Sequence, residues 1–143
     1  MKGKIFSLLT VIVVIAVMAM PTFASSSNFS FIMKHRVVDG SKNGEYHSLN
    51  GGTYPTLSGE MYQDGGFLYN NNLRNNVYVE LRNKTSGNSF GEVNLGRPTL
   101  DGSSVDFSET FSKKTGGGSK YYLIVYRIAD DGRVMRGFGT LED

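Results

Sequence analysis

The segment from Asp39 to Glu45 carries oxygen side chains at the spacing of a cation site. They stand at relative positions one, three and five, as in the first half of a calcium-binding loop, and are Asp39, Ser41 and Asn43. Gly44 follows at position six, but position twelve is Asn50, where a bidentate glutamate is needed. Because Asp-Gly and Asn-Gly are also the usual turn residues of hairpins, the sequence predicts a hairpin here. Calcium is the alternative, and no other cofactor is indicated.

The only two histidines, His35 and His47, flank this segment. They could act as metal ligands or as an acid–base pair if neighbouring strands placed them opposite one another. A tight turn at Asn43-Gly44 would instead pair Lys42 with Glu45 and separate the two imidazoles. We therefore expect no functional histidine pair.

Patterns typical of catalytic sites are missing from the sequence. The chain has no cysteine to act as a nucleophile, no serine in a nucleophile-elbow pattern and no phosphate-binding glycine loop. Carboxylates such as Glu60 and Asp64 could in principle form a glycosidase pair, although nothing distinguishes them from other acids. The sequence predicts a protein that is not an enzyme, with a small hydrolase as the least favoured alternative.

The chain has eight tyrosines and no tryptophan, and tyrosine is a frequent contact residue. Between residues 64 and 76, aromatic and aliphatic side chains lie among glycines and asparagines. Such a loop could bind a glycan or a protein by stacking and amide hydrogen bonds, and its candidate residues are Phe67, Leu68, Tyr69, Asn71 and Asn72. The alternative is that the loop folds back and its aromatic side chains fill the edge of the fold.

The N-terminal residues have the three-part plan of a secretory signal peptide. Lys2 and Lys4 precede an apolar run over residues 5–20, and small residues lead up to Ala24. The run is short for a transmembrane helix. We expect cleavage between Ala24 and Ser25, which gives a signal peptide over residues 1–24, a single domain over residues 25–143 and a secreted protein of bacterial type.

Cleavage would change the charge of the chain. The two lysines lost leave 13 basic and 13 acidic residues, so the mature protein is formally neutral. A neutral chain with interspersed signs predicts no nucleic-acid partner and no stable membrane insertion after processing. Without cysteine, an exported domain has no disulfides and depends on burial for its stability.

Apolar residues recur at period two, between clusters of glycine, asparagine, aspartate and serine. Residues 29–34, 77–82 and 105–111 alternate as strands with one buried face. The run from Tyr121 to Ile128 is apolar at both parities, which predicts a central strand covered on both sides. After a turn at residues 130–132, residues 134–141 are predicted to return as its hairpin partner.

Shorter strands are expected at residues 46–49, 56–62 and 90–95, for a total of seven or eight. The predicted fold class is all-β, an antiparallel β-sandwich of immunoglobulin-like or jelly-roll-like type, with a small barrel as the alternative. Long loops at residues 64–76 and 113–119 suit crossings between two sheets.

These observations favour a secreted, non-enzymatic protein that binds an extracellular partner, which could be an envelope glycan, a protein or further copies of the chain. The alternative is a secreted inhibitor, an antimicrobial protein or the resistance partner of one. The chain shows no strongly cationic amphipathic segment of the kind that attacks membranes directly.

Overall fold

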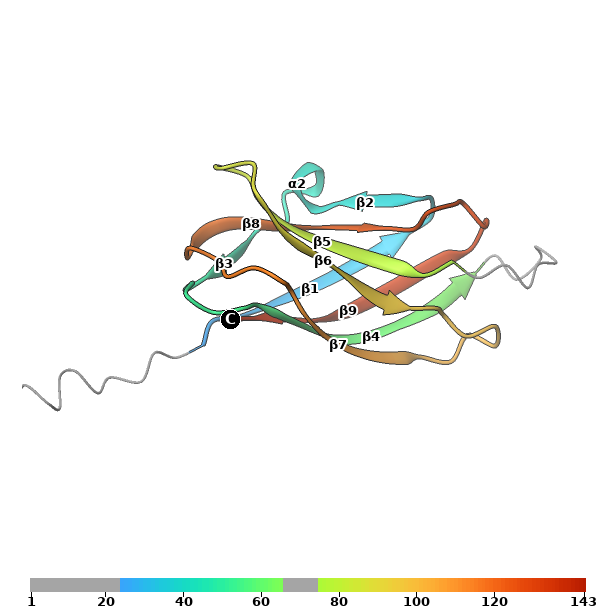
Figure 1. The fold of residues 1–143 in the computed structure, drawn as a ribbon. Coiled ribbons are helices and arrows are strands. Elements are labelled where there is room, and N and C mark those ends of the chain that lie inside the picture. The colour runs from blue at the N-terminus through green and yellow to red at the C-terminus, as the bar shows by residue number, and fades with distance from the viewer. Residues whose placement is uncertain (1–23, 66–74) are drawn as a thin grey trace, which may run out of the picture.

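The computed structural model describes residues 24–65 and 75–143. These residues form two antiparallel sheets that pack face to face (Figure 1). The predicted β-sandwich is therefore confirmed, and the strands described do not close into a barrel. The signal peptide predicted over residues 1–24 lies outside the described residues except for Ala24.

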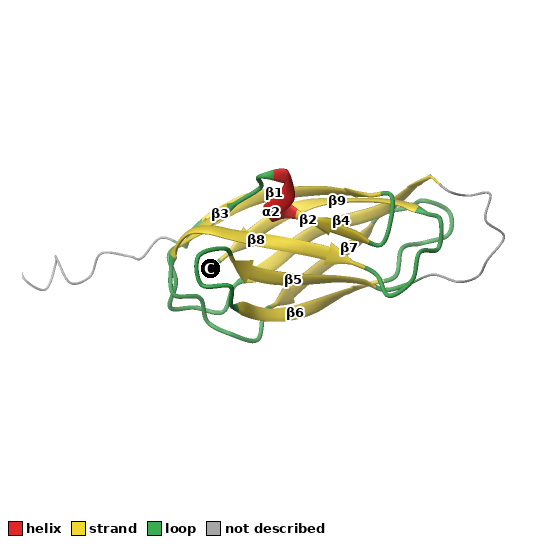
Figure 2. Ribbon diagram, turned by 90° about the horizontal axis from the view of Figure 1, so that it is seen from above, coloured by secondary structure: helices red, strands yellow, loops and turns green. Residues whose placement is uncertain are grey.

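The four-stranded sheet has the order β1-β9-β4-β7, with bounds Ser26–Met33, Val134–Glu142, Thr56–Gly65 and Val105–Thr110. The five-stranded sheet has the order β2-β8-β5-β6, with bounds Val37–Asp39, Gly118–Tyr126, Val77–Asn83 and Ser89–Gly96. A short strand, β3 (His47–Leu49), also pairs with β8. One helical turn, α2 (Gly40–Asn43), lies between β2 and β3 and is red in Figure 2.

The core forms because alternate residues of each strand point between the sheets. The predicted inward residues are buried: Phe29, Phe31 and Met33 in β1, Val77, Val79 and Leu81 in β5, and Phe107 in β7 with Phe111 just beyond it. The half-buried reading of these three runs is confirmed. The strand that sequence reasoning did not anticipate is β2, which has only three residues.

Glycines let two edge strands reach across the inner face of the four-stranded sheet. Phe29 lies opposite Gly139, which lies opposite Gly59, which in turn lies opposite Phe107. Because neither central residue has a side chain, the two phenylalanine rings meet above them with centroids 6.3 Å apart. A Cβ on Gly139 would overlap the carbonyl of Ser58, so the strands approach too closely there for any other residue.

The predicted hairpin of β8 with β9 is wrong. β8 pairs with β2, β3 and β5, whereas β9 pairs with β1 and β4 in the other sheet. The buried guanidinium of Arg127 explains the crossing, because its Nη2 donates to the carbonyls of His35 (3.1 Å) and Arg133 (2.7 Å). The connection wraps around this cation and delivers β9 to the opposite layer.

The expectation that β8 is covered on both sides is also wrong. Its inward residues Leu123 and Val125 are buried, but Tyr122, Ile124 and Tyr126 are only half-buried on the outer face of the sandwich. Tyrosine makes both parities look apolar in sequence, although its ring can pack sideways on a sheet while its hydroxyl meets water. The placement of β8 inside its sheet, between β5 and β2, is as predicted.

Both long loops connect strands of different sheets, as predicted. Residues 64–76 lead from β4 to β5, and residues 113–119 lead from β7 to β8. At the edge formed by β6 and β7, the layers are joined by the Lys113 amide, which donates to the Phe90 carbonyl at 3.2 Å. The opposite edge, between β1 and the β2-α2-β3 segment, is hollowed.

Candidate functional site

The loop residues selected from the sequence as ligand-binding candidates are Phe67, Leu68, Tyr69, Asn71 and Asn72, and they lie outside the described residues. The two flanks of this loop are bound to the sandwich. Asp64 pairs with Arg136 of β9, and the Asn75 amide donates to Asp131 at 3.2 Å. Ligand binding by the loop stays a prediction.

The predicted hairpin at Asp39 to Glu45 is wrong, because the segment forms the helical turn α2. Asp39 is its N-cap and accepts from the Ser41 amide (3.0 Å) and from the Ser41 hydroxyl (2.7 Å). Gly44 ends the turn with a positive φ of 76°, which glycine adopts without steric cost. In this arrangement Ser41 donates to the Asp39 carboxylate. The oxygens of Asp39, Ser41 and Asn43 are not arranged around a common cation position.

The two histidines are not opposed, as expected, although for a different reason. Both flanking strands pair with β8 and not with each other. His35 is exposed, with its Nδ1 3.7 Å from Asp130. His47 is buried, and its Nδ1 is hydrogen-bonded to the Ser27 hydroxyl at 2.8 Å, which ties β3 to β1 across the two layers.

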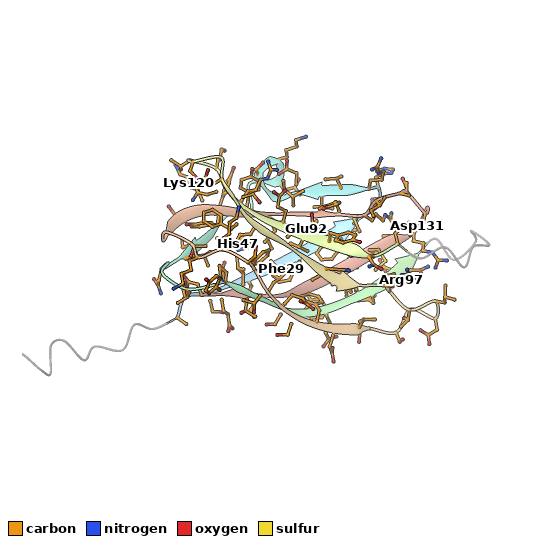
Figure 3. All side chains as sticks on the ribbon, in the orientation of Figure 1. Phe29, His47, Glu92, Arg97, Lys120 and Asp131 are labelled. Carbon is orange, nitrogen blue, oxygen red and sulfur yellow. The ribbon has the colours of Figure 1, made fainter. Side chains whose placement is uncertain are left out.

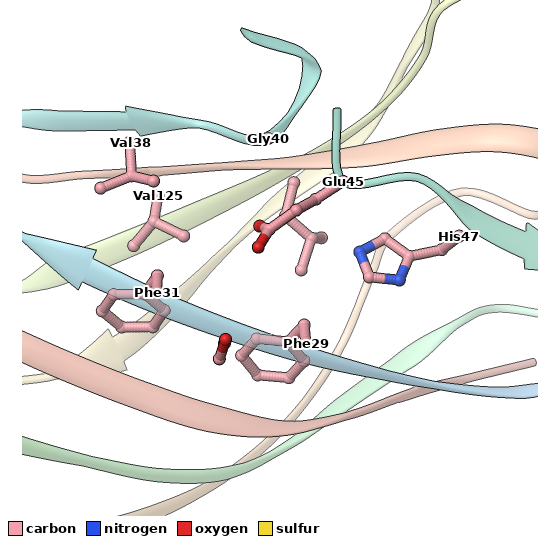
Figure 4. Close-up of a pocket in the computed structure, with 9 residues that line it drawn as sticks. Phe29, Phe31, Val38, Gly40, Glu45, His47 and Val125 are labelled. Atoms are coloured by element: carbon pink, nitrogen blue, oxygen red, sulfur yellow. The ribbon is translucent and has the colours of Figure 1, made fainter. Parts of the chain in front are cut away.

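Ser27 and His47 have the residue types of a nucleophile and its base, but the surroundings do not complete a catalytic site. Burial lowers the pKa of His47 and so disfavours its charged form. His47 and Glu45 line a hollow beside β1, whereas Ser27 does not line it (Figure 4). Since the hydroxyl does not face the space where a substrate could sit, the pair is best explained as a cross-layer hydrogen bond.

The carboxylates considered for a hydrolase are also poorly placed. Glu60 and Asp64 lie on the same outer face of β4, four residues apart, which corresponds to roughly 13 Å along a strand. Glycosidase carboxyl groups lie about 5 to 10 Å apart. Asp64 is in addition paired with Arg136. This pair does not have the geometry of glycoside hydrolysis.

The hollowed edge contains two open depressions. One of about 400 Å³ lies beside Tyr46 and His47, and one of about 370 Å³ lies beside Val37 and Lys42. Between them the layers leave a space of only about 10 Å³, enough for one water molecule. Figure 4 shows this space, with Phe29 and Phe31 on one side and Val38 and Val125 on the other. The space enclosed between the layers at this edge is therefore too small for a ligand.

The most distinctive surface of the described residues is the outer face of the five-stranded sheet. Four of the eight tyrosines gather there, and we call them the tyrosine face: Tyr46, Tyr78, Tyr122 and Tyr126. Ile124 lies between Tyr122 and Tyr126 on the same side of β8. All five side chains are half-buried, and no described element packs over them.

The rings of the tyrosine face support each other in pairs. Tyr78 lies opposite Tyr126, and their rings stack with centroids 5.5 Å apart and an interplanar angle of 23°. Tyr46 meets Tyr122 edge to face, with centroids 6.4 Å apart. The register places Val37 next to Tyr126 and Asn94 next to Tyr78, so the stacked pair is flanked on both sides.

Charged side chains are interleaved with these rings. The Tyr126 hydroxyl donates to Glu92, and burial together with this hydrogen bond raises the pKa of Tyr126 to about 12. Lys84 donates to the Tyr46 hydroxyl at 2.6 Å and lies over its ring, and the hydrogen bond raises the pKa of Lys84. Glu80 pairs with Arg82 at 3.0 Å (Glu80 Oε1 to Arg82 Nε). The face thus offers fixed rings, hydroxyls and both signs of charge.

The sequence contained a signal for this face. The alternation in β8 is broken because Tyr122, Ile124 and Tyr126 are large and apolar at the parity where a half-exposed strand has polar residues. By its alternation alone, this pattern predicts burial on both sides of the strand. An exposed row of aromatic side chains produces the same sequence pattern. Only the structure, by showing whether another layer packs on that side of β8, distinguishes the two cases.

A buried polar cluster that follows the C-terminal end of β8 has a structural role. Arg127 pairs with Asp131, and Arg133 donates to Gln63 at 2.5 Å between the layers. Figure 3 shows Asp131 and Arg97 at the end of the sandwich opposite Lys120, with His47 and Phe29 between the sheets. Since each guanidinium is bound to acceptors, the cluster joins β4, β8 and the β8–β9 connection.

No family model, curated protein or solved structure matches the chain. Within residues 24–65 and 75–143 there is no helix long and apolar enough to cross a membrane. The same part of the chain holds no group of three or more histidine, cysteine or acidic residues that could bind a metal ion.

Proposed function

We propose that this protein is a secreted, non-enzymatic binding protein and that its tyrosine face contacts a protein partner outside the cell. The observation that carries the proposal is the gathering of Tyr46, Tyr78, Tyr122 and Tyr126 on an outer sheet face over which no described element packs. Export is the expectation from the N-terminal sequence, and it supplies the extracellular setting.

The composition of the face supports a protein contact. Tyrosine and arginine are enriched at the centres of protein interfaces, where each combines a large contact area with a polar group. Arg82 lies next to Tyr122 and Glu80 in the same patch. The rings are held by their neighbours before a partner arrives, so their side chains lose little conformational freedom on binding.

Ring orientation favours a protein over a glycan. Sugar rings stack on open aromatic faces, but Tyr78 and Tyr126 direct their faces toward each other, and Val37 and Asn94 stand beside them. The groups left for a partner are ring edges and hydroxyls. A protein surface, with its mixture of aliphatic groups, amides and charges, is complementary to that arrangement.

Site-specific photo-crosslinking tests the proposal. A photo-reactive phenylalanine analogue replaces Tyr122 in one variant and Phe138 in a control, because Phe138 is exposed on the outer face of the other sheet. We expect a defined protein adduct in the producing culture from position 122 and not from position 138. The adduct should disappear when Ile124→Lys is added, since a cation would then lie at the centre of the contact.

Three results would overturn the proposal. The first is an equal yield of adducts from both positions, and the second is no adduct from position 122 in a protein that is folded by circular dichroism. The third is binding of purified wall polysaccharide that is lost in the Ile124→Lys variant and kept in Phe138→Ala. That result would assign the face to a glycan.

A further inference from the structure

The turn between β1 and β2 concentrates positive charge that the neutral total of the mature chain conceals. Lys34, His35 and Arg36 form the turn, and Lys42 of α2 lies beside the same depression of about 370 Å³. The side chains of Lys34, Arg36 and Lys42 are exposed and make no hydrogen bond or ion pair with any described residue. All 13 acids of the chain are among the described residues, so no acid elsewhere is available to pair with them.

Acids near the turn are already engaged. Asp39 caps α2 through its bonds to Ser41. Asp130 lies near His35 and within 3.5 Å of Arg127, and Asp131 is paired with Arg127. The three cations are therefore unpaired because of the local structure, and their charge is directed to solvent.

Aliphatic side chains stand exposed among these cations. Ile32 and Val37 line the depression and are 47% and 55% exposed. Ile128 is 66% exposed, and it follows Arg127, whose amide donates to the Arg36 carbonyl at 3.0 Å. Three segments thus place one aliphatic tip each at the same corner of the molecule. We define the basic corner as Ile32, Lys34, His35, Arg36, Val37, Lys42 and Ile128.

We propose that the basic corner is a docking surface for an anionic lipid membrane. Negative headgroups complement Lys34, Arg36 and Lys42, and the aliphatic tips can enter the boundary between headgroups and acyl chains. Lys34 and Arg36 lie between Ile32 and Val37 along the chain, and this mixture of basic and aliphatic side chains suits a fluid lipid surface better than a peptide. The contact is peripheral; it borders the tyrosine face at Val37, which lies next to Tyr126, and includes none of the four tyrosines.

Vesicle binding tests the proposal with matched charge variants. The protein beginning at Ser25 is sedimented with phosphatidylcholine vesicles, with and without phosphatidylglycerol. We expect binding only when phosphatidylglycerol is present, and weaker binding as salt rises. The triple variant Lys34→Glu/Arg36→Glu/Lys42→Glu should bind at least tenfold more weakly, because each basic residue near the surface contributes about fivefold.

The control carries the same change of net charge elsewhere, as Lys113→Glu/Lys114→Glu/Lys120→Glu, and should lose much less binding. A second variant, Ile32→Ser/Val37→Ser/Ile128→Ser, keeps every charge and should still bind several-fold more weakly. Equal loss in both charge variants would overturn the proposal, because net charge alone would then govern binding. An unaffected serine variant would overturn it too, and so would binding to a soluble polyanion without binding to vesicles.

A single-tryptophan probe gives an independent readout that does not depend on loss of binding. The natural chain has no tryptophan. Ile128→Trp should shift its emission to the blue on anionic vesicles and be quenched by brominated lipid, whereas Leu100→Trp, in the exposed connection between β6 and β7 at the other edge of the sandwich, should show neither effect. Quenching at position 100 without quenching at position 128 would place the membrane contact elsewhere and refute the basic corner.

Discussion

His47 is the residue at which burial has the clearest chemical consequence. Its ring lies between β1 and β3, is hydrogen-bonded to Ser27 and borders the same space as Glu45. Burial disfavours the charged imidazolium, so the folded protein lowers the pKa of His47 below its ordinary value of 6.5. In the unfolded chain that pKa returns toward the ordinary value.

This difference predicts a pH-dependent stability. Between the lowered folded value and 6.5 the unfolded chain binds more protons, so the free energy of unfolding falls as the pH drops below 6.5. His47→Gln, which cannot take up the proton, should flatten that slope. Urea denaturation between neutral pH and about pH 5 measures it, above the range in which most carboxylates titrate.

The exposed histidine provides the control. His35→Gln should retain the slope of the natural protein, because the His35 ring is largely in solvent and no cross-layer hydrogen bond depends on it. If His47→Gln keeps the full slope while His35→Gln removes it, the assignment to the buried imidazole is wrong.

At the scale of single residues, the sequence identified which side chains could contact a ligand. It did not show which of them are already occupied by other contacts in the fold. Asp39, Ser41 and Asn43 have the spacing of cation ligands, but spacing does not say which oxygen is already bound. In the structure the Asp39 carboxylate accepts both donors of Ser41. The number of tyrosines predicts contact residues, yet their gathering on one face depends on strand pairing between positions more than 40 residues apart, as between Tyr78 and Tyr126.

At the scale of single elements, β8 separates a buried side from an exposed side. Leu123→Asp should destabilise by about 3 kcal/mol or more, because an unpaired carboxylate would enter the core. Ile124→Asp should cost about 1 kcal/mol, since its side chain remains in contact with water. Chemical denaturation compares the two variants. Similar losses would show that the outer side of β8 is covered after all.

The helical turn α2 makes a specific prediction about calcium. Because Ser41 already satisfies Asp39, millimolar calcium should leave the melting temperature equal to that in chelator. Asp39→Ala should lower it slightly in both conditions, by the loss of an N-cap worth about 1 kcal/mol. A melting temperature that rises with calcium in the natural protein and not in Asp39→Ala would show that the turn rearranges to bind the ion.

The sequence predicted strands well where a single local pattern determines them. It predicted them less well where contacts with distant parts of the chain decide the arrangement. The alternation in β1, β5 and β7 gave the correct buried face, because a half-buried strand needs no information from outside itself. The β8–β9 connection reads as a hairpin but crosses the sandwich, because Arg127 organises it through the carbonyls of His35 and Arg133. Those contacts join distant segments and have no local sequence signature.

At the scale of the whole molecule, the net charge of the chain does not show how its charged side chains are distributed over the surface. Residues 25–143 contain 13 basic and 13 acidic residues, which cancel, and this balance predicts no affinity for anionic surfaces. Folding buries Arg127 and Arg133 with their partners and leaves Lys34, Arg36 and Lys42 together at one corner. Net charge describes the molecule at long range, whereas a membrane or a protein meets one face at a time.

The expected processing site lies where the two ends of the domain meet. The Ser25 amide donates to the Asp143 carboxylate at 3.2 Å, and the Asp143 amide donates to the Ser25 carbonyl at 3.2 Å. The other oxygen of Asp143 accepts from the Gly51 amide at 2.5 Å. One carboxylate thus joins the start of β1, the end of β9 and the β3–β4 connection.

Cleavage between Ala24 and Ser25 would turn the Ser25 amide nitrogen into an ammonium group beside that carboxylate. We predict that the protein beginning at Ser25 is more stable than one that keeps Ala24 and a preceding residue, because a charged pair replaces a neutral donor. Both groups are half-buried, so the expected coupling is about 0.5 to 1 kcal/mol. A double-mutant cycle that combines the two N-termini with Asp143 and Asp143→Asn measures it.

The neighbouring acid is the control for this cycle. Glu142 contacts the Ser26 hydroxyl at 3.4 Å and does not contact the Ser25 nitrogen, so Glu142→Gln should show no coupling to the N-terminus. Mass spectrometry of the exported protein should find Ser25 as its first residue. A mature protein that begins elsewhere would refute the cleavage site. A Ser25 terminus with zero coupling to Asp143 would instead show that the ammonium remains fully solvated and that processing adds nothing to the stability of the fold.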